Sequence, residues 1–450
     1  MVAKMNRVKA LFILNIILFF ALAGPSKALE VIRDTELEQF TDEILKILLL
    51  SSNLEAEDFN VYFINSNQVN AFVTGGKNIF INTELIIKAE DYREYASVIA
   101  HELAHILGGH VFRASEELTN ISNKALPIYL LGIIGLITGA SEAGFAGVMV
   151  GQAAVSDTFT YYSRTQEAAA DQKAVSILCD SMIDASYLSS FLKRLETINS
   201  NAQTKSDNYR STHPIPRDRI NWIQLALKNN EKCNYEIDIE LENRFNLIKA
   251  KLFGFTHSYD ETKAVYNSND NQDLYANAVS SYLNGEHNQS TKKLKKLIKE
   301  NNENPFFKEL IGEIYFMNQK YHEAIYFQTA AINNLKTEND IYMMMLGNYL
   351  LSTDETEKVK ESIYYLKKSI LLNSKNSYSW YLLAKAYAFI NEISFANYAT
   401  AERYFLIGER RLSYDFALKA IKGIEENTPE WYRTYDLIEI LKKEVSTNTN

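Results

Sequence analysis

The chain has 450 residues, 46% of them hydrophobic and 23% charged, so it is long enough to fold into two or three globular domains. Its net charge of -9 argues against a nucleic-acid partner, because contact with phosphate groups requires a basic surface. With only 6 prolines and 17 glycines, a mainly α-helical protein is favoured over a turn-rich β fold.

Residues 1–28 have the pattern of an export signal. Basic residues precede the apolar run LFILNIILFFALAG, and small residues precede Leu29. We therefore expect cleavage before Leu29 and a mature protein in the periplasm; the alternative is an uncleaved N-terminal anchor. Two cysteines, Cys179 and Cys233, are too few for a disulfide framework, and the sequence leaves open whether they are bonded.

A helix and a small sheet are predicted next. Helical spacing with an acidic start predicts a helix over 34–50, and three β-like runs cover 60–64, 70–74 and 78–82. Alternation along these runs places three residues in a core, namely Val73, Ile79 and Ile81. The helical period returns over 91–111, where six apolar residues line one side: Ala96, Ile99, Ala100, Leu103, Ile106 and Leu107.

Residues 125–155 form the least polar stretch after the signal, with Glu142 as their only charge. The small residues of the second half suit close helix packing and favour a pair of buried helices. Peripheral contact with a membrane, or a membrane-spanning hairpin, stays open as the alternative.

From residue 270 onward the sequence predicts one helix after another. Three blocks, 309–332, 344–370 and 381–405, each carry a small residue in their first helix, namely Gly312, Gly347 and Ala384. Their spacing of about 34 residues is that of tetratricopeptide helix pairs. The middle block departs from the pattern, because it has extra residues and Val359 where alanine is expected. We expect an α-solenoid over 270–450 after a connector with one helix over 231–269; an unrelated helical bundle is the alternative.

The segment VIAHELAHILGGH predicts a metal site. His101 and His105 are four residues apart and share a helix face, so both imidazoles can hold one ion. Glu102 is placed to take a proton from an activated water. A catalytic zinc needs a third protein ligand. His110 is not expected to be that ligand, because on a continuing helix it faces away from the other two histidines.

A better third ligand lies in SRTQEAAADQKA. Glu167 would sit on a separate helix whose alanines allow close packing, and Asp171 follows one turn later on the same face. A carboxylate at that second position can accept the other ring N–H of a ligand histidine. From the residues alone, without any resemblance, the favoured interpretation of both is solvated charges on a helix surface.

Four motifs in order, NAFVTGG, VIAHELAHILGGH, SRTQEAAAD and STHPIPRDRI, resemble the BepA and HtpX group of zinc metallopeptidases over about residues 35–230. The resemblance implies an α+β metallopeptidase domain at 29–230 that holds one Zn²⁺ per chain. It implies a set of site residues: His101, His105 and Glu167 as ligands, Glu102 as general base, Asp171 behind the ligands, Arg219 as the family's arginine, and His213 near the metal. His213 would be either a fourth ligand that closes a latent site or a donor to the developing oxyanion.

Together with the helical tail, the resemblance points to the exported branch of this group. Such an enzyme would cleave unfolded or misassembled proteins, and its repeats would recruit outer-membrane β-barrel proteins and their assembly machinery. Two alternatives stay open. One is a chaperone or scaffold with a latent metal site, and the other is an integral membrane protease.

Overall fold

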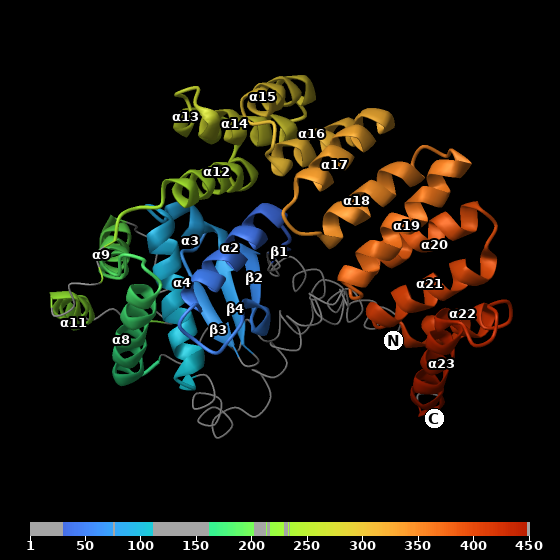
Figure 1. Ribbon diagram of the computed structural model, residues 1–450, viewed down its shortest axis with the longest axis horizontal. Helices are drawn as coiled ribbons and strands as arrows, with labels where there is room; N and C mark the ends of the chain where they lie inside the picture. Colours follow the sequence, from blue (N-terminus) through green and yellow to red (C-terminus); the bar gives the residue numbers. More distant parts are fainter. Residues whose placement is uncertain are drawn as a thin grey trace, which may run out of the picture.

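The structure is a computed structural model that describes residues 30–74, 77–110, 162–201, 213, 217–228, 233 and 235–447 (Figure 1). The export signal predicted at 1–28 and the apolar stretch 125–155 lie outside these residues. Within the described ranges, every helix is too short or too polar to span a membrane.

A four-stranded mixed sheet forms the β part of the fold. Its strands are β1 (Glu30–Ile32), β2 (Asn60–Asn65), β3 (Ala71–Thr74) and β4 (Asn78–Asn82), in the order β1-β2-β4-β3. β2 and β4 are parallel, whereas the two outer pairs are antiparallel. The three predicted strands and the burial of their three core residues are confirmed. β1 was not predicted, because three residues are too few to give a pattern.

Helices cover the sheet and complete the first core. They are α2 (Thr35–Leu48), the short turn η1 (Ala56–Asp58), α3 (Thr83–Lys88), α4 (Tyr92–Leu107), α8 (Arg164–Asp180), α9 (Ser186–Asn201) and α11 (Arg217–Lys228). α4 lies between the sheet and α8, and it also packs on α9 (Figure 1). The predicted helix over 34–50 is confirmed as α2, which begins after the capping side chain of Asp34.

α4 is buried on nearly all its sides. Every residue from Tyr92 to His105 except Arg93 is buried, so the helix is a central element and not an amphipathic one. The prediction that Leu107 lines the buried side is wrong, since its side chain is 39% exposed. Leu107 is the last residue of the helix, where the burial that holds from Glu94 to His105 has ended.

The segment expected to be a connector with one helix contains two, α12 (Ile239–Thr256) and α13 (Tyr259–Val265). α12 is not a loose linker. Four of its apolar residues belong to the first core: Leu241, Phe245, Ile248 and Leu252. Its other side packs on α14, where a Cβ at Gly254 would lie only 2.5 Å from the carbonyl oxygen of Ala276. α12 therefore joins the two halves, and the domain boundaries expected from the sequence stay predictions.

A disulfide joins Cys179, near the end of α8, to Cys233, shortly before α12. It closes a loop of 54 residues that contains α9, His213 and α11. In the chain-entropy account, closing a loop of that length stabilises the folded state by about 4 kcal/mol. The question that the sequence left open is thus answered in favour of a bond.

The second half consists of helix pairs that follow one another in an arc (Figure 1). The pairs are α14 (Asn271–Leu283) with α15 (His287–Glu300), α16 (Pro305–Met317) with α17 (Tyr321–Asn334), α18 (Asp340–Leu351) with α19 (Thr356–Leu372), α20 (Ser377–Phe389) with α21 (Ile393–Leu406), and α22 (Arg410–Ala420) with α23 (Pro429–Thr447). The predicted repeat of helix pairs is therefore present.

The turn inside each of the first four pairs contains one residue with positive φ. These residues are Gly285, Gln319, Asp354 and Asn391, at intervals of 34, 35 and 37 residues. The extra residues noticed in the middle block account for the longest interval, because α19 has 17 residues whereas α17 has 14. In that block a Cβ at Gly347 would lie 2.7 Å from Cγ of Leu366 on α19, so the small residue permits the close helix approach that the sequence predicts.

A buried charge cluster links the first core to the repeats. Nζ of Lys251 on α12 lies 2.7 Å from carboxylate oxygens of both Asp34 and Glu36 at the start of α2. The hydroxyl of Tyr275 on α14 donates to Glu36 at 3.0 Å. These contacts fix the first repeat helices against the sheet-containing half.

Candidate metal centre

α4 carries the first three site residues in its last turns. The helix begins at the side chain of Asp91, which accepts hydrogen bonds from the backbone N–H groups of Arg93 and Glu94. His101, Glu102 and His105 are fully buried. Buried ionisable groups are costly unless they have partners, so this burial already indicates a specific set of neighbours.

α8 carries the two carboxylates. The helix starts with a capping box between Ser163 and Gln166, which places Glu167 one turn inside it. Ala170 and Ala174 are fully buried, and their small side chains let α8 approach α4 closely. Glu167 is fully buried and Asp171 is 4% exposed, so neither is a solvated surface charge.

Folding brings four candidate ligands together: His101, His105, Glu167 and His213. Their donor atoms lie within 4.8 Å of one another. Nε2 of His101 lies 3.1 Å from Nε2 of His105, 3.5 Å from Oε2 of Glu167 and 3.4 Å from Nδ1 of His213. Oε1 of Glu167 lies 3.3 Å from Nε2 of His105 and 3.0 Å from Nδ1 of His213. His110 is not in this set, as expected.

These separations fit a tetrahedral metal ion. Ligands bound tetrahedrally at about 2.0–2.1 Å from zinc are roughly 3.3 Å apart, and the observed separations of 3.0–3.5 Å bracket that value. Imidazole nitrogens with one carboxylate oxygen are also ligands that zinc accepts. The residues present therefore fit the ion that the sequence implies.

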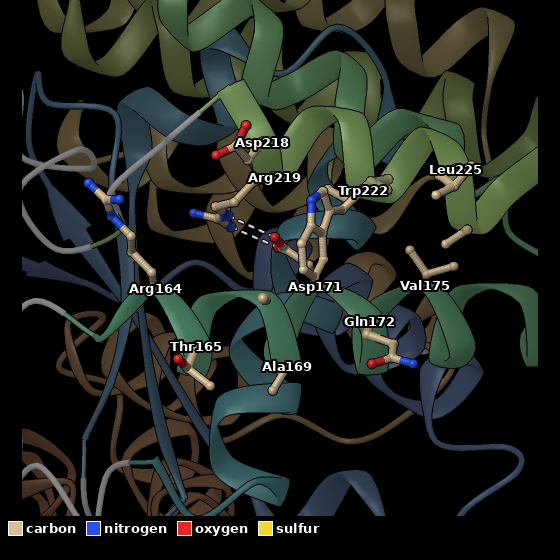
Figure 2. A pocket seen from close by; sticks show the side chains of 13 residues that line it. Arg164, Thr165, Ala169, Asp171, Gln172, Val175, Asp218, Arg219, Trp222 and Leu225 are labelled. Carbon is tan, nitrogen blue, oxygen red and sulfur yellow. Dashed lines mark hydrogen bonds and ion pairs between the residues drawn. The ribbon is translucent and has the colours of Figure 1, made fainter.

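Arg219 and Asp171 contact two of the candidate ligands, Glu167 and His101. The guanidinium of Arg219 on α11 donates from Nε and Nη2 to the two oxygens of Asp171, each at 2.7 Å, as Figure 2 shows. Its third nitrogen lies 2.6 Å from Oε2 of Glu167. Asp171 in turn lies 3.0 Å from Nδ1 of His101. A ligand histidine is thereby oriented through its second nitrogen, as is usual at metal sites.

The two histidines on α4, His101 and His105, have pKa values shifted in opposite directions. Burial lowers the pKa of His105 to about 3, so this imidazole is neutral and has a lone pair for a cation. Burial also disfavours the charged form of His101, but hydrogen bonds to Asp171 and Glu167 outweigh it and raise its pKa to about 9. A metal ion at this site therefore competes with a proton.

The two glutamates of the site, Glu102 and Glu167, also have pKa values shifted in opposite directions. Burial raises the pKa of Glu102, and neither of its oxygens has a hydrogen-bond partner among the described residues. Burial acts on Glu167 too, but His213 and hydrogen bonds to three histidines hold its pKa well below the usual value. Glu167 is thus an ionised candidate ligand, whereas Glu102 is a carboxylate that can exchange a proton.

A groove of about 810 Å³ lies between α8 and α11, and Arg219 and Asp171 are among the residues that line it (Figure 2). Small residues of α8, such as Ala169, form one wall, and the exposed side chains of Trp222 and Leu225 on α11 form the other. None of the four candidate ligands lines this groove.

Two neighbours of His105 were not assigned to the site from the sequence. The ring of Tyr162 stacks on it with centroids 3.8 Å apart, and the only signal was an aromatic residue directly before the capping Ser163. Nδ1 of His110 lies 3.1 Å from Nδ1 of His105. The expectation that His110 faces away is wrong, because α4 ends at Leu107 and the chain turns back.

Comparisons with known proteins agree with this geometry. The profile of peptidase family M48 matches residues 32–226. The beta-barrel assembly-enhancing protease of Escherichia coli (strain K12) is 24% identical over 405 residues, which cover 84% of this chain and 77% of that protein. The human mitochondrial metalloendopeptidase OMA1 is 27% identical over 188 residues, 39% of this chain and 34% of that protein.

Among solved structures, YrrB, described as a TPR protein with an unusual peptide-binding site, is 17% identical and covers 40% of this chain and 98% of its own, with a TM-score of 0.26. The family match spans α4 and α8, which supply three of the four candidate ligands, and it also includes His213 and Arg219. Residues 32–226 are therefore a peptidase family M48 domain, which makes the chain a metallopeptidase.

Proposed function

We propose that the chain is an exported zinc endopeptidase whose repeat region recruits the proteins that it cleaves. The observation that carries the proposal is the buried set of three imidazole nitrogens and one carboxylate at tetrahedral separations beside Glu102. His101, His105 and Glu167 hold one Zn²⁺ per chain. Arg219 and Asp171 keep His101 and Glu167 in position.

When bound, zinc supplies a Lewis acid that polarises the scissile carbonyl and lowers the pKa of an attacking water. Glu102 takes the proton of that water on its carboxylate and passes it to the nitrogen of the leaving amine. Its burial supports this role, because a carboxylate with a raised pKa holds a proton more readily near neutral pH. Asp171 and Arg219 hold their charges throughout and move no proton.

His213 has two proposed roles. Its Nδ1 lies among the ligand atoms, and its Nε2 lies 3.4 Å from Oε1 of Glu102. In this position it would complete four protein ligands and contact the base, which is the arrangement of a latent site. If it moves aside when a substrate binds, the same ring is close enough to donate to the developing oxyanion, an effect worth a few kcal/mol.

The proposed clients and location follow from relatives and from the sequence. A relative that matches 84% of the chain is named a beta-barrel assembly-enhancing protease. We infer by analogy that the clients are outer-membrane β-barrel proteins and their assembly machinery, which fits an export signal at 1–28 and a periplasmic location. The helix pairs at the C-terminal side supply a surface long enough to hold an extended client segment.

The first experiment is metal analysis of the purified chain. The wild type should contain one equivalent of zinc, and Glu167→Ala should contain almost none, because it removes the anionic ligand. Glu57→Ala is the control, since that side chain is an exposed glutamate outside the set of candidate ligands. Equal zinc in all three proteins would contradict the ligand assignment.

The second experiment separates binding from catalysis. Glu102→Gln should keep its zinc and lose peptide hydrolysis by about 100-fold or more, because the amide accepts no proton. Cleavage of an unfolded client at the wild-type rate would show that another group is the base.

The third experiment distinguishes the roles of His213 and tests the alternative function. His213→Ala should increase self-cleavage if His213 closes a latent site, whereas unchanged or reduced cleavage would favour the oxyanion role. The same proteins test the chaperone alternative. A chaperone with a latent metal site is favoured by two results together. Glu102→Gln and His213→Ala would still prevent client aggregation, and neither the wild type nor His213→Ala would cleave the client.

A further inference from the structure

His110 contacts the ring nitrogen of His105 that faces away from the ligand set. The two Nδ1 atoms are 3.1 Å apart, with ring centroids separated by 5.0 Å and ring planes at 75°. His110 is only 5% exposed, so this contact is made inside the protein. The other nitrogen of His105, Nε2, points to Glu167 and to His101.

The chemistry of imidazole determines which ring donates. A metal ligand must offer a lone pair, so Nε2 of His105 carries no proton when it binds an ion. A neutral imidazole has one N–H, which in His105 is then on Nδ1. The hydrogen bond therefore runs from Nδ1–H of His105 to Nδ1 of His110, and His110 accepts it with its own proton on Nε2.

We propose that His110 is the positioning residue of His105, in the way that Asp171 is the positioning residue of His101. It binds neither metal nor substrate, and it fixes the tautomer and the orientation of the second ligand imidazole. The stacked ring of Tyr162 covers the face of His105, whereas His110 holds its edge. This inference rests on the proposed function, because it takes His105 as a ligand.

Two glycines make this contact available. A helix that continued beyond Leu107 would turn His110 by about 140° from His105, since each residue adds about 100°. Instead, Gly108 ends the helix and Gly109 adopts a φ of 64°, a conformation that glycine accepts without strain. A Cβ at Gly108 would lie 2.7 Å from Nε2 of His110, so this position has room only for glycine while the His110 ring stays in place.

The test uses substitutions that differ in where they offer an acceptor. The Oδ1 atom of asparagine occupies the place of Nδ1 of histidine, whereas the acceptor of glutamine corresponds to Nε2, and leucine has none. We would measure the zinc dissociation constant of the full chain by competition with a chelator for His110→Leu, His110→Gln and His110→Asn. The thermal unfolding temperature of the metal-free proteins is the check on folding.

His110→Leu and His110→Gln should bind zinc roughly 10–100-fold more weakly, which is the usual effect of losing such a partner. His110→Asn should retain most of the wild-type affinity. His322→Leu, which changes an exposed histidine of the repeat region, should leave the affinity unchanged. Gly108→Ala should weaken zinc binding like His110→Leu with little change in unfolding temperature, because the side chain that must move is the end of the His110 ring.

Wild-type zinc affinity in His110→Leu would overturn the inference, and so would an asparagine variant as weak as the leucine variant. If His110→Leu also lowers the unfolding temperature of the metal-free protein, the zinc affinity of Gly108→Ala is the deciding measurement. Wild-type zinc affinity in Gly108→Ala would reject the positioning role. Loss of zinc in Glu167→Ala together with wild-type affinity in His110→Leu would reject only this inference. Retention of zinc in Glu167→Ala would reject the proposed site itself.

Discussion

The cluster around Lys251 offers a quantitative test of how the two halves are joined. We consider Lys251→Met, which keeps the length of the side chain and removes its charge. The Lys251 side chain is 8% exposed, and it is the cation that contacts both Asp34 and Glu36. Removing one partner of a buried ion pair costs about 3–5 kcal/mol, because the remaining charge is left without compensation.

The structure places the expected loss at the lower end of this range. Glu36 keeps the hydrogen bond from Tyr275, and Asp34 keeps the one from the backbone N–H of Leu37, so neither carboxylate is left without a partner. We therefore expect a loss of about 3 kcal/mol at pH 7. For a folding unit of about 200 residues this corresponds to a decrease of roughly 6–12 °C in unfolding temperature.

The loss should depend on pH in a defined direction. Burial raises the pKa of Glu36 in the folded protein above its ordinary value of 4.5, and Lys251 opposes that rise. Without Lys251 the folded state takes up a proton on Glu36 more readily than the unfolded state does, so acid stabilises the variant relative to neutral pH. The difference from the wild type should be largest at pH 7 and should shrink as the pH falls toward 4.5.

Differential scanning calorimetry of the full chain at pH 7 and at pH 5 measures both effects. The control is Lys46→Met, which removes an exposed lysine paired with Asp42 and should cost no more than about 0.5 kcal/mol. The reasoning is wrong if the two variants unfold within about 2 °C of each other at pH 7. It is also wrong if the loss in Lys251→Met grows toward acid pH.

Three further predictions concern the site, the repeats and the disulfide. Asp171→Asn should weaken zinc binding roughly 10–100-fold in a chelator competition, and unchanged affinity would deny it a role behind the ligands. Gly347→Ala should be about 1–3 kcal/mol less stable than the matched Gly312→Ala in chemical denaturation. The reason is that a Cβ at Gly347 would lie 2.7 Å from Leu366, whereas a Cβ at Gly312 finds ordinary contacts of at least 3.4 Å. Equal stabilities would contradict the close packing at Gly347. Replacing Cys179 and Cys233 by alanine should lower the free energy of unfolding by about 2–4 kcal/mol, and an unchanged unfolding temperature would argue against the bond.

The parts that the sequence by itself determined are governed by local geometry. Four-residue spacing places His101 and His105 on one helix face in any helix, and alternation places Val73 and Ile79 in a core in any sheet. The repeats could be found because each helix pair needs a small residue at the same place, and the observed interval of 34 residues between Gly285 and Gln319 agrees.

Tertiary structure decided everything that joins distant segments. Residues alone left Glu167 and Asp171 as possible surface charges, and only the packing of α8 on α4 buries them beside the histidines. The family resemblance named Arg219, but its three contacts with two carboxylates exist only when α11 lies against α8. His110 was misjudged because Gly108 ends the helix and Gly109, with its positive φ, breaks the helical period that the prediction extended. A periodic pattern records the order within one element, whereas a metal centre depends on how several elements pack, and that packing is a property of the whole fold.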